Sequence, residues 1–374
     1  MKKILFWFII GFILIRTAVF IFLNQLSFTR PFFPEYSSRL YSQSQYVLGN
    51  GSKRAIGDDG VYSYAGYYLV FQKGDVSAVN FEHPPLGKYL IGVSIALFHN
   101  ENVTNLFYYA GILIFTFLLG KIVFRDQLLA MIPVFFFSMD PLVNNHLTLS
   151  LLDLPFTLFF LAGTYFFIRG FTKNKIWFLS FFFWGIAFAT KFFPFFVVLY
   201  LFFFLCVFVR ARRHLIVFVG ASLLVPIIYL IAHTTFFFYH PSLIEFLRHK
   251  KWMIDWWMGS PIIRGNIIRN IFTGWYYDSV DNLVRNEYWS ILLPIVTVLA
   301  LFRFRKDLYR KNRVILFLYG EMGIYMAYLI LFNNGIQKYL MPIYPLMLIL
   351  ALSTILLIIR SIMSSNKVKR TKTL

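Results

Sequence analysis

The sequence has 374 residues, of which 59% are hydrophobic, 21% aromatic and 14% charged. Soluble globular domains carry roughly 25% charged residues, so this composition excludes an ordinary soluble domain and predicts a surface that faces lipid. Lys and Arg number 36 against 16 Asp and Glu, which gives a formal net charge of +20. In so apolar a chain this excess indicates membrane topology, and no nucleic-acid partner is expected.

Segments long and apolar enough to cross a membrane, about 20 residues, recur along the chain. The first follows Lys2 and Lys3, and we interpret it as a retained anchor because no small-residue cleavage site follows it. The sequence therefore predicts an all-α polytopic helix bundle, residues 1–374 forming a single domain with no separate soluble domain. The ten predicted spans are 4–23, 103–124, 127–143, 154–169, 176–190, 194–209, 215–232, 289–303, 314–333 and 338–359.

Basic residues predict the orientation, because cytoplasmic loops retain Lys and Arg. Ten spans with nearly all the net charge inside place both termini in the cytoplasm of a multi-pass protein, in a membrane that we expect to be a prokaryotic plasma membrane. The long loops 24–102 and 233–288 then lie outside. The apolar stretch 84–98 would reverse every later basic loop if it crossed, so we predict an interfacial or re-entrant helix at the outer leaflet.

The outer loops hold nearly all the carboxylates, and an acid pair stands out in GDDGVYSYAGYYL at 57–69. Tyr residues at helical spacing follow Asp58 and Asp59 and suit the headgroup level of a bilayer. An acid held there is partly desolvated, which raises its basicity. The alternative is helix capping, because Asp is common ahead of a helix. Both interpretations remain open at this point.

A second cluster, NFEHPPLGKYLIG at 80–92, places Glu82, His83 and Lys88 within seven residues. The Pro pair stiffens the entry to a helix. A cation at the edge of a bilayer can meet a lipid phosphate, so Lys88 is a candidate phosphate ligand. The alternative is that its side chain only snorkels to the headgroups.

These segments resemble a family. HPPLGKYLIG, preceded by DDGVYSYAGYYL, resembles the first outer loop of the protein O-mannosyltransferase and aminoarabinose transferase group of the glycosyltransferase C superfamily. The likeness continues in HLTLSLLDLPFTLFFLAG (146–163), GIAFATKFFPFF (185–196) and IQKYLMPIYPLMLILA (336–351). The blocks follow the family order and cover about a third of the chain, whereas the loop 233–288 matches nothing.

The resemblance implies an enzyme that transfers a sugar, with inversion, from a polyprenyl-phosphate donor to a hydroxyl or amine of a protein, lipid or glycan acceptor. The reaction would take place on the non-cytoplasmic face, in contact with membrane lipids. Asp58 matches the catalytic acid and would act as general base, and Asp59 and Asp153 are the other catalytic candidates. The candidates for substrate binding are Glu82, His83, Lys88, Lys191, Lys338 and Tyr339.

Two positions depart from the family pattern. Relatives place Glu where Asp59 stands, and they often place Arg where Lys338 stands. An Arg guanidinium can bind phosphate through two hydrogen bonds, whereas the Lys338 ammonium offers a point charge. No cofactor is required, although Asp58, Asp59 and Asp153 could hold a divalent cation such as Mg²⁺ or Mn²⁺; no metal site is readable from the spacing. A transporter or flippase of lipid-linked sugars, and a non-catalytic protein of the same fold, remain alternatives.

Overall fold

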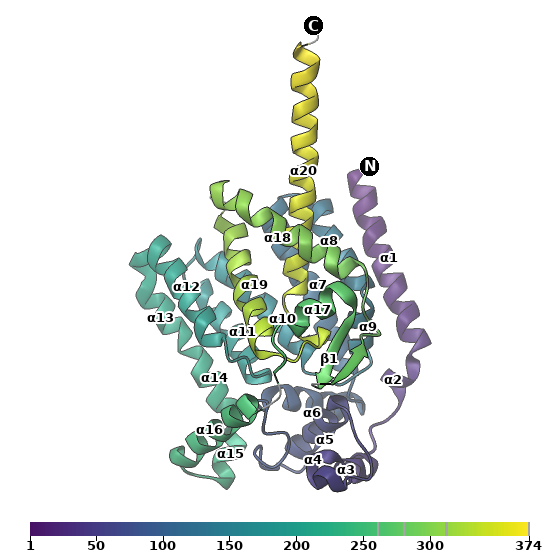
Figure 1. Ribbon diagram of the computed structural model, residues 1–374. Helices are drawn as coiled ribbons and strands as arrows, with labels where there is room; N and C mark the ends of the chain where they lie inside the picture. The colour runs from purple at the N-terminus through teal and green to yellow at the C-terminus, as the bar shows by residue number, and fades with distance from the viewer. Residues whose placement is uncertain (260–261, 280, 311–312, 373–374) are drawn as a thin grey trace. The chain divides into compact units, whose positions relative to one another are not determined.

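The computed structural model of the protein describes residues 1–259, 262–279, 281–310 and 313–372, with side chains outside 303–310 and 364–372. The described chain is almost entirely helical, which confirms the predicted all-α polytopic bundle (Figure 1). It forms two compact units. The first unit comprises Met1–Ile13, Thr116–Leu142 and Ile262–Leu374, and the second comprises Leu14–Phe115 and Val143–Pro261.

The elements follow one another as a long series of helices interrupted by a single hairpin. In chain order they are α1 (Lys2–Leu23), α2 (Gln25–Thr29), α3 (Pro34–Ser42), α4 (Gln45–Leu48), η1 (Gly49–Gly51), α5 (Asp58–Phe71), α6 (Leu86–Phe98), α7 (Val103–Phe124), α8 (Gln127–Met139), α9 (Pro141–Leu147), α10 (Asp153–Gly170), α11 (Ile176–Thr190), α12 (Phe196–Ala211), η2 (Arg212–His214), α13 (Leu215–Ser222), α14 (Leu224–Ala232), α15 (Thr234–Tyr239), α16 (Leu243–Gly259), α17 (Asn266–Thr273), β1 (Trp275–Ser279), β2 (Asn282–Arg285), α18 (Leu292–Arg310), α19 (Arg313–Phe332), η3 (Gln337–Leu340) and α20 (Tyr344–Lys372).

The number of predicted spans, about ten, is not confirmed. Among the described residues, five helical stretches are long and apolar enough to cross a membrane, or six if α8 and α9, which meet at a bend of 65°, form one broken span. One of the five, Phe196–Ala232, contains the reversal at η2. There the hydroxyls of Tyr200 and Ser222 lie 3.3 Å apart, so α12 and α13 pack against each other.

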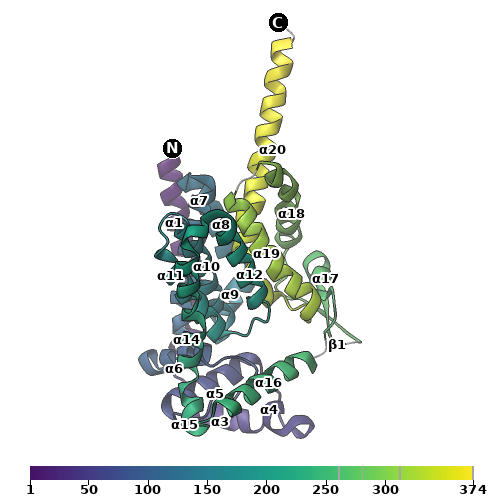
Figure 2. The ribbon, with the colours of Figure 1, turned by 90° about the vertical axis from the view of Figure 1, so that its left-hand side faces the viewer.

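Helices α5 and α6 of the second unit lie side by side in both views (Figures 1 and 2). Their close approach depends on two glycines, since a Cβ on Gly92 would lie 2.3 Å from the main-chain oxygen of Gly66. Helix α6 has 13 residues, and at 1.5 Å per residue it is shorter than the roughly 30 Å hydrocarbon core. A straight α6 is therefore too short to cross the membrane by itself. This length is compatible with the predicted interfacial or re-entrant helix.

The first unit packs α18 and α20 together and adds the only strands of the described chain. The Thr354 hydroxyl donates to the main-chain oxygen of Leu299 at 2.7 Å, which joins α20 to α18. Strands β1 and β2 pair in antiparallel register, with Trp275 opposite Arg285. The predicted outer loop 233–288 thus contains three helices, α15, α16 and α17, and this small hairpin.

Candidate functional site

The predicted acid pair lies in the first turn of α5. The N-cap is Gly57 and not either acid, so the capping interpretation is not what the structure shows; carboxylates in a first turn still favour the positive end of the helix dipole. The Tyr46 hydroxyl donates to Asp58 Oδ1 at 3.3 Å. Asp59 turns its carboxylate back toward Gly57, where a Cβ would lie 2.6 Å from Asp59 Oδ1.

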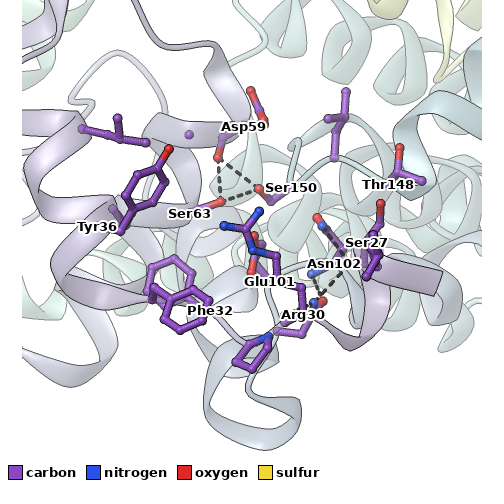
Figure 3. A pocket seen from close by; sticks show the side chains of 18 residues that line it. Ser27, Arg30, Phe32, Tyr36, Asp59, Ser63, Glu101, Asn102, Thr148 and Ser150 are labelled. Carbon is purple, nitrogen blue, oxygen red and sulfur yellow. Dashed lines mark hydrogen bonds between the residues drawn. The ribbon is translucent and has the colours of Figure 1, made fainter. Parts of the chain in front are cut away.

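The main chain of Asp59 joins α5 to the segment that precedes α10. Its carbonyl oxygen accepts hydrogen bonds from the Ser63 hydroxyl at 2.7 Å and the Ser150 hydroxyl at 3.0 Å (Figure 3). The two hydroxyls lie 2.5 Å apart. This cluster brings Asp153, three residues beyond Ser150, to the same side of α5 and α6, because Leu151 and Leu152 pack in one apolar cluster with Val61 and Ile91.

Asp153 and Lys191 form a buried ion pair, although 38 residues separate them in sequence. Lys191 Nζ lies 2.6 Å from Asp153 Oδ1, and the side chains are 8% and 3% exposed. The pair lies next to the start of α6, since a Cβ on Gly87 would lie 2.7 Å from Leu152 and 3.0 Å from the main-chain oxygen of Thr190. Burial makes such a pair sensitive to loss of either partner.

The loop before α6 closes around Lys88. The ammonium is fully buried and donates to the main-chain oxygens of Asn80 at 2.5 Å and His83 at 2.9 Å. Burial lowers the pKa of Lys88 to about 7, although the negative charge of Glu82 opposes this. Lys88 therefore holds the loop and does not reach outward to the headgroups, so the snorkelling alternative does not describe this structure. Asn80 also donates to Glu82.

Helix α16 covers this loop, a contact that sequence reasoning missed. The Trp257 indole donates to the main-chain oxygen of Glu82 at 2.8 Å. The His83 ring lies between Trp257 on α16, at 5.3 Å, and Tyr62 on α5, at 6.1 Å. Only the richness of 252–257 in Trp marked the segment in the sequence, and it gave no partner. His83 is thus held next to Tyr62, which lies one helical turn after Asp58 on α5.

Helix α16 also brings a second buried lysine. Lys250 Nζ lies 2.7 Å from His233 Nε2 and 5.3 Å from the centre of the Tyr229 ring. Burial, together with the positive charge of Lys88, lowers the pKa of Lys250 to about 7. Lys250 is thus a second buried amine of the second unit, on the helix that covers the loop 80–88.

A cavity of about 370 Å³ lies beside the first turn of α5. Asp59, Gly60 and Ser63 line it from α5, and Arg30 and Glu101 line it from the segments flanking α2 and α7 (Figure 3). Its volume is in the range of small-molecule sites.

Lys338 and Tyr339 belong to the first unit, whereas the other predicted residues belong to the second. The Lys338 ammonium lies 5.5 Å from the centre of the Tyr339 ring. Buried amides position η3: Asn270 donates to the main-chain oxygen of Gly335 at 2.8 Å, and Asn286 donates to Gln337. The structure thus gathers seven of the nine predicted residues in the second unit and places these two in the other.

The predicted carboxylates do not form a ready metal site. Among the described residues, no group of three His, Cys, Asp or Glu side chains is close enough to hold a metal ion. Asp153 accepts from Lys191, and Asp59 turns toward Gly57. The divalent cation stays a prediction.

Fold and site together define a polytopic membrane protein whose second unit collects buried lysines and carboxylates around α5 and α6. Residues 82–239 match the family described as dolichyl-phosphate-mannose-protein mannosyltransferase. They include His83, Lys88, Asp153 and Lys191. No curated protein sequence matches the chain.

Two solved structures share the fold. ArnT from Cupriavidus metallidurans bound to undecaprenyl phosphate aligns with a TM-score of 0.59 and 14% identity over 92% of this chain, and its apo form with 0.55 and 13% over 90%. The chain spans about 60% of the length of these ArnT chains. The family match and the shared fold confirm the predicted resemblance to the glycosyltransferase C superfamily.

Proposed function

We propose that the protein is a membrane glycosyltransferase that moves a sugar from a polyprenyl-phosphate donor to an acceptor hydroxyl or amine on the non-cytoplasmic face. The observation that supports the proposal is the placement of Asp58 in the first turn of α5, of His83 and Lys88 at the entry to α6, and of the buried Asp153–Lys191 pair next to the start of α6. All but Asp58 lie within the matched residues 82–239. The likeness to an ArnT bound to undecaprenyl phosphate supports a lipid-phosphate donor.

In the proposed reaction Asp58 is the general base. It takes the proton as the acceptor oxygen attacks the anomeric carbon in line. The bond between the anomeric carbon and the phosphate oxygen breaks, its electron pair stays on the phosphate, and the configuration inverts. The phosphodiester monoanion thereby becomes a polyprenyl phosphate dianion, so positive charge nearby lowers the barrier.

The cations have different parts in this scheme. Lys191 meets the developing phosphate charge while Asp153 fixes its position, and loss of such a contact typically costs about 3 kcal/mol in the barrier. Lys88 holds Glu82 and His83, which orient the substrates. Lys338 and Tyr339, in the first unit, stay predicted substrate-binding residues. Asp59 supports the first turn of α5 and faces the cavity beside it.

Replacement of Asp58 by Asn tests the proposal. The amide keeps the size and the acceptor oxygen for Tyr46 but cannot take the proton, so the rate of sugar transfer from a polyprenyl-phosphate sugar should fall about 10²- to 10⁴-fold. The melting temperature should stay near that of the wild type. Glu35→Gln, which removes an exposed carboxylate from α3, is the matched control and should keep full activity.

Two results would contradict the proposal in different ways. Unchanged turnover in Asp58→Asn would remove Asp58 as the base. A wild type that releases no sugar from any polyprenyl-phosphate donor would favour a flippase of lipid-linked sugars or a non-catalytic protein of the same fold.

A further inference from the structure

The cavity beside Asp59 has a wall of aromatic side chains. Phe32, Phe33 and Tyr36 line it from α3 and the chain before α3. Tyr36 is 39% exposed and Phe33 is 49% exposed, so part of each ring is open to a ligand. Flat aromatic faces next to polar groups suit the C–H face of a sugar ring, which buries apolar surface while its hydroxyls stay hydrogen-bonded.

One buried acceptor of the cavity, on Asn102, has no hydrogen-bond partner among the described residues. The Asn102 amide group donates to the main-chain oxygen of Ser27 at 3.2 Å, but its Oδ1 is buried without a hydrogen bond from any described residue. Asn102 is only 7% exposed and lines the cavity. A buried polar atom without a partner is costly, so this oxygen indicates a donor supplied by a ligand.

The charges in the cavity are two carboxylates and one guanidinium. Burial raises the pKa of Glu101, the positive charge of Arg30 lowers it, and the negative charge of Asp59 raises it again. Among the described residues, no salt bridge joins Arg30 to either acid, and Arg30 Cζ lies 5.8 Å from the Phe33 ring centre. Figure 3 shows Arg30 and Glu101 side by side in the cavity. The excess of acid disfavours an anion and leaves acceptors for hydroxyl donors.

We propose that this cavity is the acceptor subsite and that it binds an uncharged, hydroxyl-rich sugar ring, a deduction that rests on the proposed glycosyltransferase function. In the proposed reaction Lys191 meets the donor phosphate, whereas Asp59 and Glu101 repel an anion from this cavity. The donor phosphate and the acceptor ring thus bind to different groups of the second unit. Asp59 lines the cavity and Asp58 precedes it in the same turn of α5, so the proposed base lies beside the proposed acceptor subsite.

The test measures binding of two probes that share a ring and differ in charge, methyl α-D-mannopyranoside and mannose 6-phosphate. The protein is reconstituted in lipid nanodiscs, because alkyl glycoside detergents would compete, and saturation-transfer NMR titrations give the dissociation constants. The neutral probe should bind about tenfold or more tightly than the phosphorylated one. Equal affinity of the two probes, or no binding of the neutral one, would overturn the proposal.

Two variants and a control locate the binding. Glu101→Gln should weaken binding of the neutral probe about tenfold, because a hydrogen bond to a charged acceptor is lost. Ser37→Trp, which fills the cavity from α3 without changing charge, should abolish it. Glu35→Gln removes the same charge from the exposed face of α3 and should bind like the wild type. Binding that survives Ser37→Trp in a protein with normal thermal unfolding would refute the assignment.

Failure of this deduction and failure of the proposed function give different results. If the wild type transfers sugar but binds neither probe in the cavity, the proposed function stands and the proposed acceptor subsite is refuted. The wild type could instead bind the neutral probe, with Ser37→Trp abolishing that binding, and release no sugar from polyprenyl-phosphate donors. The cavity would then be a sugar-binding site, and the proposed transferase function would be refuted.

Discussion

The side chains of Asp153 and Lys191 show how individual residues are fixed in this site. Each would be costly to bury alone, and the 2.6 Å contact between them offsets that cost. Asp153 is also the first residue of α10, where the helix dipole favours a carboxylate. The ion pair therefore places the Lys191 ammonium at the start of α6, and Asp153 fixes the position of that ammonium.

Removal of one partner should destabilise the protein more than removal of both. Asp153→Leu leaves a buried ammonium without a counter-charge and should lower the free energy of unfolding by about 3–5 kcal/mol. The double variant Asp153→Leu, Lys191→Met should recover most of that loss yet stay inactive, because the cation is gone. Thermal unfolding and sugar release are the measurements. A double variant as unstable as the single one would contradict this explanation.

Burial also makes His249 sensitive to pH. Its ring stacks on Phe236 at 5.2 Å, and burial together with the charge of Lys250 lowers the pKa of His249 to about 4. The unfolded chain, with a pKa near 6.5, binds the proton first as pH falls. Stability from this group is thus present above pH 6.5 and is lost progressively between about pH 6.5 and 4.

Helix α16 should loosen in that pH range. Hydrogen exchange of 243–259 should rise as pH falls from 6.5 to 4, after correction for intrinsic rates, with a loss of about 2–3 kcal/mol. His249→Phe keeps the stacking but removes the titration, so its exchange should depend less on pH. The Asp75–His240 contact at 2.7 Å stays in that variant and serves as the internal reference. An identical pH profile in the two proteins would exclude His249.

Among the elements, α5 and α6 set the geometry on which the proposed reaction depends. The first turn of α5 carries Asp58, and the loop entering α6 carries His83 and Lys88. Gly66 and Gly92 let the two backbones approach closely, so the spacing between base and loop follows from the absence of side chains at the crossing.

A methyl group at this crossing should separate the helices. In Gly92→Ala the new Cβ would lie 2.3 Å from the Gly66 oxygen and 2.4 Å from Val70 Cγ2, which should cost about 1–3 kcal/mol or more of unfolding free energy and lower the transfer rate. Gly323→Ala on α19 is the control, because nothing lies within 4 Å of its Cβ and helix propensity favours Ala. Equal melting temperatures for the two variants would contradict the crossing argument.

For the whole molecule, the proposed function requires the α5 side to face away from the cytoplasm. The exposed residues Lys53, in the loop before α5, and Lys173, between α10 and α11, should lie on opposite sides of the membrane. In a Cys206→Ser background, Lys53→Cys should react with an impermeant maleimide added outside intact cells, and Lys173→Cys should react only after permeabilisation. The reverse pattern would overturn the predicted orientation.

The fold class and the main site segments were predictable from particular residues. Apolar runs with few charges identify membrane helices because lipid admits little else, and HPPLGK together with Asp58 marked the loop that the structure places around α5 and α6. The number of spans was less predictable. The apolar runs in α11 and in 292–302 are 15 and 11 residues long. Their length leaves a membrane crossing undecided.

Composition, apolar periodicity and short motifs are local properties, and they determined that this is a polytopic helical membrane protein resembling glycosyltransferases of the C superfamily. The tertiary structure alone decided which distant groups meet: Lys191 with Asp153, Trp257 with Glu82, and Lys250 with His233. It also turned Lys88 inward and opened the cavity beside Asp59. The physical reason is that contacts across many residues depend on how helices cross and what they exclude from water, and no local pattern encodes those distances.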